Sequence, residues 1–182
     1  MNPVEFSLKP FPGEEPRSEI GIAGTVGRCA EALSVAFTLT GNLPEIALPA
    51  PAESPKRKDR LWEETCLEFF LGTTDSPRYW EFNLSPAGHW NVYRFASYRS
   101  GMREEPAVAS LPFLLRTEPG VLEISLELGL GKILPPGKTV EAAVCAVLRT
   151  VSGRTSRWAL DPSGTRPDFH RRDGFSLILP AE

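Results

Sequence analysis

Short runs in which every second residue is apolar recur along this chain, and they constrain its fold more than any other feature of the sequence. In residues 33–39 leucine, valine, phenylalanine and leucine occupy the odd positions, with smaller or polar residues between them. Residues 122–128 repeat the pattern, with glutamate and serine at the alternate positions. Because the side chains of a β-strand point alternately to its two faces, each run predicts a strand with one face toward a core and the other toward water.

Weaker alternation predicts further strands, and residues 140–151, which are apolar on both parities, predict a central one. Many short strands at intervals of about ten residues, separated by Gly- and Pro-rich turns and without a convincing amphipathic helix, predict an all-β fold, an antiparallel β-sandwich of the jelly-roll type. A parallel α/β fold is excluded on the same ground. The weaker strands are expected at 20–26, 67–71, 79–84, 90–95 and 175–179. The expected inner layer contains Leu33, Val35, Phe37, Leu67, Phe69, Leu71, Phe82, Leu84, Leu122, Ile124, Leu126, Val144 and Leu148.

The length and charge of the chain limit the classes of protein to consider. With 182 residues, 41% of them hydrophobic, it can bury one substantial core, and we expect a single domain over residues 1–182. The net charge is −3, and the longest basic run, 56–60, is interrupted by Asp59 and followed by two glutamates. We interpret this run as a solvated loop, and we expect no nucleic-acid partner because no broad cationic face is evident.

Cysteine usage and the first residues bear on location. Cys29, Cys66 and Cys145 are odd in number and widely spaced, which predicts free thiols in a reducing compartment rather than disulfides or a zinc site. The chain begins without the charged and apolar regions of a secretory signal, and no apolar stretch approaches the roughly 18 residues of a membrane span. We therefore expect a cytoplasmic protein with no membrane partner. The sequence does not indicate the oligomeric state.

A glutamate at the centre of an apolar strand is the first functional signal. If the leucines and phenylalanine of 67–71 face the core, Glu68 lies on the opposite sheet face. The same parity places Glu81 and Asn83 beside it on the next strand. A short turn then brings in a third strand, which offers Tyr93 in one register or Arg94 in the other.

Carboxylate, amide, phenol and indole groups on one sheet face suit sugar recognition. Sugar hydroxyls need planar polar partners, while the C–H face of a pyranose packs on an aromatic ring. The alternative is a solvated outer face with ordinary cross-strand pairs, because such alternation is the default for antiparallel sheets.

Three segments carry a family resemblance. They read "LWEETCLEFFLG", then "YWEFNLSPAGHWNVYRF", and near the end "WALDPSGTRPDFHRRDGF". In order and spacing they resemble the carbohydrate-binding modules of family 9 and the related DOMON-like domains, over about residues 20–180. Each motif is short, but their order and spacing agree. As a stand-alone chain without a secretion signal, it resembles the bacterial DOMON-like group.

The resemblance implies a β-sandwich that clamps a saccharide or similar small polar ligand between two aromatic rings. By the match, Trp62 is the first ring, Glu68 accepts hydrogen bonds from hydroxyl groups, and Asn83 is a further polar contact. Phe169 takes the place of the second ring, where sugar-binding members usually carry tryptophan, and phenylalanine offers less stacking area. His170, beside it, is either a pocket residue or a loop residue bonded to a backbone carbonyl.

Two other functions stay open at this stage. The wider DOMON superfamily includes haem-binding members held by one methionine and one histidine, and Met102 and His170 are the candidate pair. A glycoside hydrolase needs two carboxyl groups, for which Glu68 and Glu81 on neighbouring strands are the candidates. Common nucleophile, zinc-protease and nucleotide-binding motifs are absent, which favours binding over catalysis.

No cofactor is expected. Members of the resembled family sometimes carry calcium, but no loop here has the density of oxygen ligands of a dedicated site. The residues that could supply such oxygens are Asp59, Glu63, Glu64 and Asp75.

Overall fold

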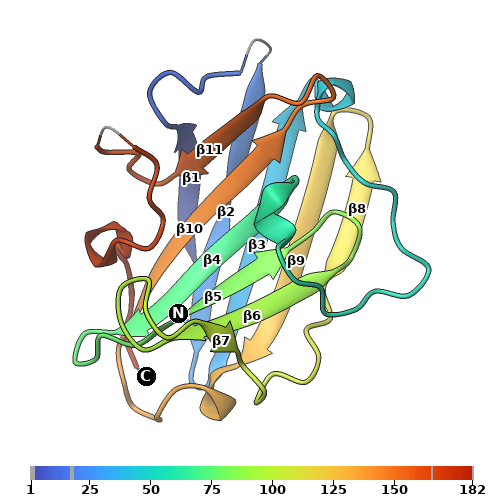
Figure 1. Cartoon of the computed structure of the whole chain (residues 1–182). Coiled ribbons are helices and arrows are strands. Elements are labelled where there is room, and N and C mark those ends of the chain that lie inside the picture. The colour runs from blue at the N-terminus through green and yellow to red at the C-terminus, as the bar shows by residue number, and fades with distance from the viewer. Residues whose placement is uncertain (1–2, 17–18, 165, 182) are drawn as a thin grey trace.

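The computed structural model describes residues 3–16, 19–164 and 166–181, which form two antiparallel sheets stacked as a β-sandwich (Figure 1). The all-β prediction is confirmed. The back sheet contains β1 (Val4–Pro10), β2 (Ile20–Cys29), β3 (Ala32–Gly41), β9 (Val121–Gly129) and β8 (Leu114–Glu118), in that order. The front sheet runs in the order β7 (Arg103–Glu104), β6 (Trp90–Phe95), β5 (Tyr79–Leu84), β4 (Cys66–Thr73), β10 (Val140–Arg149) and β11 (Thr155–Ala159), and β12 (Leu177–Leu179) also pairs with β10.

Strand β1 joins the two sheets. Its first part pairs with β2 in the back sheet, whereas Lys9 and Pro10 pair with β11 in the front sheet. Sequence reasoning did not predict this strand, although Phe6 and Leu8 share one parity and are both buried in the core. The sandwich is therefore closed along one side by a strand that belongs to both sheets.

The core between the sheets is the one that alternation predicts. Every expected inner residue is buried in a single apolar cluster, together with Trp80 and Trp158. Across the front sheet, the Phe69 and Phe82 rings stack with their centroids 4.3 Å apart. Period-two alternation thus assigned the faces of β3, β4, β5 and β9 correctly.

Two segments differ from expectation at their ends. The predicted strand at 175–179 is shorter, since β12 begins at Leu177, and Phe175 packs instead against the outer face of the front sheet. The Pro-rich connection after β3 carries the short 3-10 helix η1 (Leu43–Glu45) and inserts Leu43 and Ile46 into the core. The remaining 3-10 helices are η2 (Leu61–Glu63), η3 (Leu130–Lys132) and η4 (Arg172–Gly174).

The interpretation of residues 56–60 as a solvated loop is wrong for Arg57. Its guanidinium lies over the Trp90 ring at 4.5 Å and donates to Asn91 Oδ1 at 2.7 Å and to three backbone carbonyl oxygens. The flanking lysines are exposed. A guanidinium has five N–H donors in a fixed fork, so one side chain can tie several strand and loop carbonyls together.

The cysteines are free thiols, as predicted, but they differ in access. Cys29 is exposed, whereas Cys66 and Cys145 are buried in the front sheet. Burial and the nearby Glu68 raise the pKa of both buried thiols. In the part of the chain that the structure describes, no helix is long and apolar enough to cross a membrane.

We therefore expect one thiol of three to react in the native protein. Because the thiolate is the reactive form, an aromatic disulfide reagent should label Cys29 rapidly and the two buried thiols only after denaturation. Counting released chromophore with and without denaturant, and repeating the assay on Cys29→Ser, checks this. Rapid labelling of two or more thiols in the native protein would contradict the burial of the front-sheet cysteines.

Candidate functional site

A second apolar cluster covers the outer face of the front sheet. It contains Phe70, Tyr79, Tyr93, Phe95, Ala143, Cys145 and Phe175, with Trp62, Ala159 and Phe169 packed against it. The covering side chains come from η2 and from the long segment between β11 and β12, which lie on either side of β4 in Figure 1. This face is thus enclosed, unlike the ordinary solvated face of an antiparallel sheet.

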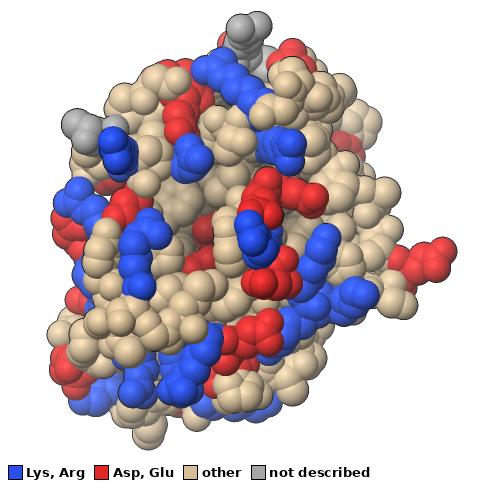
Figure 2. Space-filling view, in the orientation of Figure 1, with Lys and Arg blue, Asp and Glu red and all other residues tan. Residues whose placement is uncertain are grey.

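A cavity of about 750 Å³ opens between these coverings. Figure 2 shows the face hollowed, with acidic side chains visible at the base of the hollow and basic ones along its margin. The lining residues are Trp62, Glu63, Glu68, Glu81, Phe95, Arg99, Met102, Val147, Arg149, Thr155, Arg157, Pro167, Phe169 and His170. Its size lies in the range of small-molecule pockets, and aromatic walls with a few polar groups are typical of them.

Two buried carboxyl groups form the floor. Glu68 is 2% exposed and lies across from Cys145 on one neighbouring strand and Asn83 on the other. Glu81 is two residues before Asn83, so it is the diagonal neighbour of Glu68. Asn83 donates from Nδ2 to Glu81 Oε1 at 2.9 Å, whereas Glu68 Oε2 accepts only a weak hydrogen bond from the Cys145 thiol, at 3.7 Å, and the Cys66 thiol also lies beside Glu68. Among the described residues, Glu68 Oε1 has no hydrogen-bond partner.

Burial keeps these groups from ionising normally. Burial raises the pKa of Glu68 well above its ordinary value, and the charge of Glu81 raises it further. Burial also raises the pKa of Glu81, to about 7, against the hydrogen bond from Asn83 and the charge of Arg99. Within the described ranges, neither carboxyl forms an ion pair with a lysine or an arginine. The floor therefore holds a proton near neutral pH, because two adjacent buried carboxylates without a cation are unfavourable.

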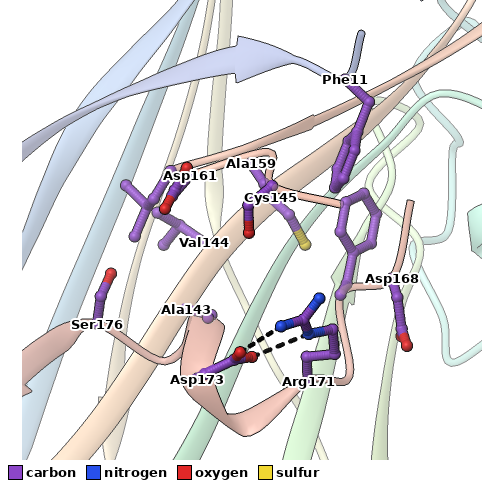
Figure 3. A pocket seen from close by; sticks show the side chains of 14 residues that line it. Phe11, Ala143, Val144, Cys145, Ala159, Asp161, Asp168, Arg171, Asp173 and Ser176 are labelled. Atoms are coloured by element: carbon purple, nitrogen blue, oxygen red, sulfur yellow. Dashed lines mark hydrogen bonds and ion pairs between the residues drawn. The ribbon is translucent and has the colours of Figure 1, made fainter. Parts of the chain in front are cut away.

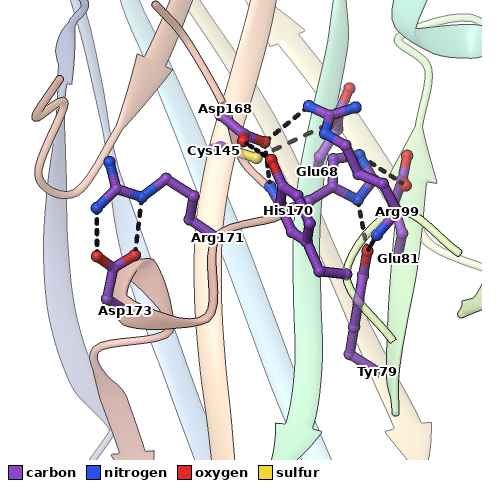
Figure 4. Close-up of polar contacts among 10 residues, drawn as sticks. Glu68, Tyr79, Glu81, Arg99, Cys145, Asp168, His170, Arg171 and Asp173 are labelled. Atoms are coloured by element: carbon purple, nitrogen blue, oxygen red, sulfur yellow. Dashed lines mark hydrogen bonds and ion pairs between the residues drawn. The ribbon is translucent and has the colours of Figure 1, made fainter. Parts of the chain in front are cut away.

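His170 closes one side of the floor (Figure 4). Its Nδ1 lies 2.8 Å from the Tyr79 hydroxyl, which also accepts from the backbone N–H of Arg99 at 3.1 Å. We assign the tyrosine proton to this hydrogen bond, so that Nε2 carries the histidine proton and faces Glu81 Oε2 at 3.8 Å. Burial, aided by the charge of Arg99, lowers the pKa of His170 to about 4. The imidazole is therefore a neutral N–H donor at pH 7.

The charges at the rim are mostly paired. Arg99 forms an ion pair with Asp168 at 2.7 Å, and Arg157 pairs with Glu14 at 2.5 Å. On η2, Glu63 pairs with Arg60. Arg149 is exposed and has no such partner among the residues that the structure describes. The mouth thus combines neutralised pairs with one solvated cation.

The structure brings four of the predicted site residues together. Trp62, Glu68, Phe169 and His170 all line the one cavity, although the two aromatic residues are far apart in sequence. Asn83 is fully buried beneath the lining, where it holds Glu81. The floor and walls proposed from the sequence therefore converge.

Strand β6 contributes one of its two predicted site residues to the cavity face and not the other. Tyr93 is buried on the cavity face, with its ring 5.5 Å from that of Trp62 and its hydroxyl bonded to Asp59. Arg94 points to the opposite face, where its Nε lies 3.6 Å from Glu105. Register explains the difference, because adjacent residues of a strand face opposite sides, so Arg94 does not reach the cavity.

A small pocket of about 150 Å³ (Figure 3) shares the lining residue Phe169 with the cavity. There the Phe11 ring packs at a tilt against the Phe169 ring, with 6.1 Å between centroids, and Arg171 pairs with Asp173. Phe11 belongs to the segment after β1, which sequence reasoning did not connect with the site. The Phe11 ring thus supports the Phe169 ring from the side of the small pocket.

The lining also includes residues that sequence reasoning did not assign to it. Phe95 continues the parity of Tyr93 and could have been found from it. Arg99 comes from a turn in which it has a positive φ of 51°, Arg149 is the last residue of β10 before the turn to β11, and Arg157 lies in the middle of β11. Nothing in the sequence pattern connects those segments with β4.

The proposed haem ligands line the same cavity, but their arrangement does not suit axial ligation of iron. Met102 lines the cavity margin and is 45% exposed. His170 has one ring nitrogen bonded to Tyr79 and the other facing Glu81, so neither is directed at Met102 as an axial ligand would be. Across the described residues, no group of three or more histidine, cysteine or acidic side chains is arranged to hold a metal ion.

Comparisons with known proteins place the fold. No protein-family model and no curated protein matches this chain. Among solved structures, a candidate carbohydrate-binding protein from Bacteroides uniformis matches with a TM-score of 0.67 at 15% identity, covering 97% of this chain and 87% of that one. A carbohydrate-binding module of family 9 from Caldicellulosiruptor kristjanssonii, in complex with glucose, matches with a TM-score of 0.53 at 11% identity, covering 95% and 83%. The chain therefore shares the β-sandwich fold of these carbohydrate-binding structures.

Proposed function

We propose that this protein is a saccharide-binding domain whose ligand enters the cavity between Trp62 and Phe169. The observation that carries the proposal is the convergence of these two rings on one cavity whose buried floor contains an unpartnered carboxyl oxygen. Aromatic faces stack on the C–H face of a pyranose, and buried polar groups pair with its hydroxyls. The likeness to a family 9 module solved with glucose supports the same ligand class.

The floor offers both kinds of hydrogen-bonding group that a sugar needs. Glu68 Oε1 can bond one hydroxyl, and the His170 N–H can donate to another. A buried polar atom without a partner costs free energy, so a hydroxyl that bonds to Glu68 Oε1 removes that cost. Stacking and a few hydrogen bonds predict millimolar to micromolar affinity, on the order of −4 to −8 kcal/mol.

Removing either wall should weaken binding. Trp62→Ala and Phe169→Ala are each expected to lower the affinity for a bound saccharide about tenfold or more, because each deletes one stacking face. Phe169→Trp is expected to raise it, since indole offers a larger face. Calorimetry with a panel of mono- and oligosaccharides and nucleotide sugars measures these effects. Leu114→Ala, on the exposed back sheet, is the matched control.

Unchanged affinity in Trp62→Ala would reject the clamp. Binding that survives both aromatic deletions would place the ligand elsewhere on the molecule. If no saccharide in the panel binds the wild-type protein, the proposed function is wrong.

A glycoside hydrolase is the second candidate, and the carboxyl pair of the floor favours it. Glu68 and Glu81 share the cavity, and the pKa of each is raised, as the general acid of such an enzyme requires. This reading predicts turnover of aryl glycosides that is lost in Glu68→Gln. Saccharide binding without any turnover leaves the domain as a binding module.

A further inference from the structure

Among the described residues, the two carboxyl groups of the cavity floor form no ion pair with an arginine, whereas a third deeply buried carboxylate, Glu105, does. Glu105 is 4% exposed, and it accepts hydrogen bonds from Trp80 Nε1 at 2.9 Å and Ala107 N at 3.0 Å, with Arg94 Nε at 3.6 Å. Glu68 is as deeply buried, yet its hydrogen-bonding neighbours are the thiols of Cys145 and Cys66, and among the described residues its Oε1 has no hydrogen-bond partner. A buried carboxylate normally needs a charged or strongly donating partner.

Glu81 is a second buried carboxyl group that lacks a free cationic partner among the described residues. Its hydrogen bond from Asn83 and its 3.8 Å approach to the neutral His170 supply dipoles but no full charge. Arg99 acts on it from the rim, but that guanidinium is paired with Asp168. Among the described residues the two carboxyl groups thus have no unpaired cation as a partner, and a proton compensates their charge until a ligand arrives.

The aromatic walls of the cavity also favour a positively charged ligand. The faces of aromatic rings carry negative potential and attract cations, indole most strongly. Trp62 and Phe169 therefore favour a cation held above the floor just as they favour a pyranose face. The rim presents little opposition, because Arg157 is paired with Glu14 and Arg149 is exposed, where solvent and salt screen it.

We infer that the cavity is built for a saccharide that carries a free amino group, with the ammonium seated between Glu68 and Glu81. The inference rests on the proposed saccharide function and narrows its ligand class. Seating the ammonium displaces the proton that the two carboxyl groups share, so the ligand replaces a proton as their counter-charge. A neutral sugar can satisfy the hydrogen bonds of the floor, but it supplies no positive charge, so the carboxyl groups then keep their proton.

Matched sugars test the charge alone. Glucosamine, galactosamine and mannosamine are each compared with their neutral parents and their N-acetyl forms by calorimetry at about pH 6.5, where the free amines are charged and the acetylated ones are not. At least one amino sugar is expected to bind about tenfold or more tighter than both matched forms. Repeating the titration in buffers of different ionisation enthalpy should reveal proton release on binding.

The pH dependence supplies an independent readout. Between about pH 6 and 7.5 the amino-sugar affinity should rise, because the carboxyl group of Glu81, whose pKa burial raises to about 7, loses its proton there. The other titratable or charged groups that face Glu81 and Glu68 are Cys66, Tyr79, Tyr93, Arg99, Cys145 and His170. The thiols and phenols stay protonated in this interval because their pKa values are raised, and His170 stays neutral.

Isosteric variants locate the effect. Glu68→Gln and Glu81→Gln keep the shape of the floor and remove its charge, so each should cut the preference for the amine over its neutral parent to about threefold or less. Glu123→Gln, on the exposed face of the back sheet, is the control and should keep the full preference.

The outcomes separate the inference from the function on which it rests. If the amines and their neutral parents bind equally, the inference is overturned and the saccharide function stands. If no sugar of either kind binds, both are overturned. A preference for the amine that persists in both glutamine variants also overturns the inference, because Glu68 and Glu81 are then not the groups that bind the ammonium.

Discussion

Replacing Glu81 by glutamine is expected to stabilise the protein, and the gain should grow as the pH rises from about 4.5 to about 7. Burial raises the pKa of this carboxyl from its ordinary value of 4.5 to about 7. The folded protein therefore holds a proton on Glu81 in an interval where the unfolded chain has released it. Stability falls with rising pH wherever the folded state binds more protons, so the wild type loses stability across this interval.

The size of the effect follows from the shift in pKa. A carboxyl displaced by this amount costs on the order of 3 kcal/mol once the pH exceeds its folded value. Glutamine carries no charge and can still accept the hydrogen bond from Asn83, so the variant avoids this loss. It also relieves Glu68, because the charge of Glu81 is the second cause of the raised pKa of Glu68.

His170 changes the stability of the protein with pH in the opposite direction, so its contribution must be distinguished from that of Glu81. Burial lowers its pKa from 6.5 to about 4, so its contribution to stability increases with pH between those values. This contribution is present in the wild type and in the variant, and it largely cancels in their difference. Arg99 keeps its charge throughout the interval.

Urea unfolding of both proteins at a series of pH values measures the difference. The free energy of unfolding of Glu81→Gln minus that of the wild type should rise to a plateau above about pH 7. Glu123→Gln, which removes an exposed carboxyl, should show no such rise. A difference that does not change with pH would mean that Glu81 is solvated or paired in the folded protein.

This expected gain has a functional meaning. A charge that destabilises the fold in the absence of ligand is retained where it serves a site, so conflicts between local rules and the fold tend to mark function. The centre of β4 is such a conflict, because Glu68 is charged and all the remaining side chains from Cys66 to Leu71 are uncharged. Glu68 could be singled out from the sequence for this reason.

Alternation predicted the two faces of the front sheet but not how the outer face is covered. The parity that placed Leu67 in the core also placed Glu68 opposite it, and both placements are confirmed. The burial of Glu68 depends on η2 and on the loop that carries Phe169, and neither has a periodic signal. Whether Tyr93 or Arg94 faces the cavity depends on the register of β6, which differs by one residue between the two cases. The local sequence pattern does not determine that register.

Strand β1 was missed for a related reason. Its alternation spans few residues and ends at Pro10, and proline is unfavourable inside a strand. The proline is tolerated because β1 changes sheets there, pairing with β11 at Lys9 and Pro10. Such a crossing is a property of two sheets together, and it has no signature in one segment.

Replacing Arg57 by alanine is expected to cost about 2–4 kcal/mol of stability, the largest loss we predict for a single polar side chain. The change leaves Asn91 Oδ1 and the carbonyl oxygens of Val92, Glu105 and Val108 without this donor, and it removes the cation from the Trp90 ring. Arg57→Lys should recover only part of the loss, because an ammonium group cannot reach the same set of acceptors.

The same substitution should also weaken saccharide binding, since the contacts of Arg57 continue into the clamp. Asn91, which accepts from Arg57, donates to the Tyr93 hydroxyl at 2.8 Å, and that ring packs against Trp62. Lys56→Ala alters an exposed neighbour in the same run and should change stability by less than about 0.5 kcal/mol. Denaturant unfolding and sugar titration of the three variants test both effects. A loss of stability in Arg57→Ala without any loss of affinity would show that η2 holds Trp62 independently of this network.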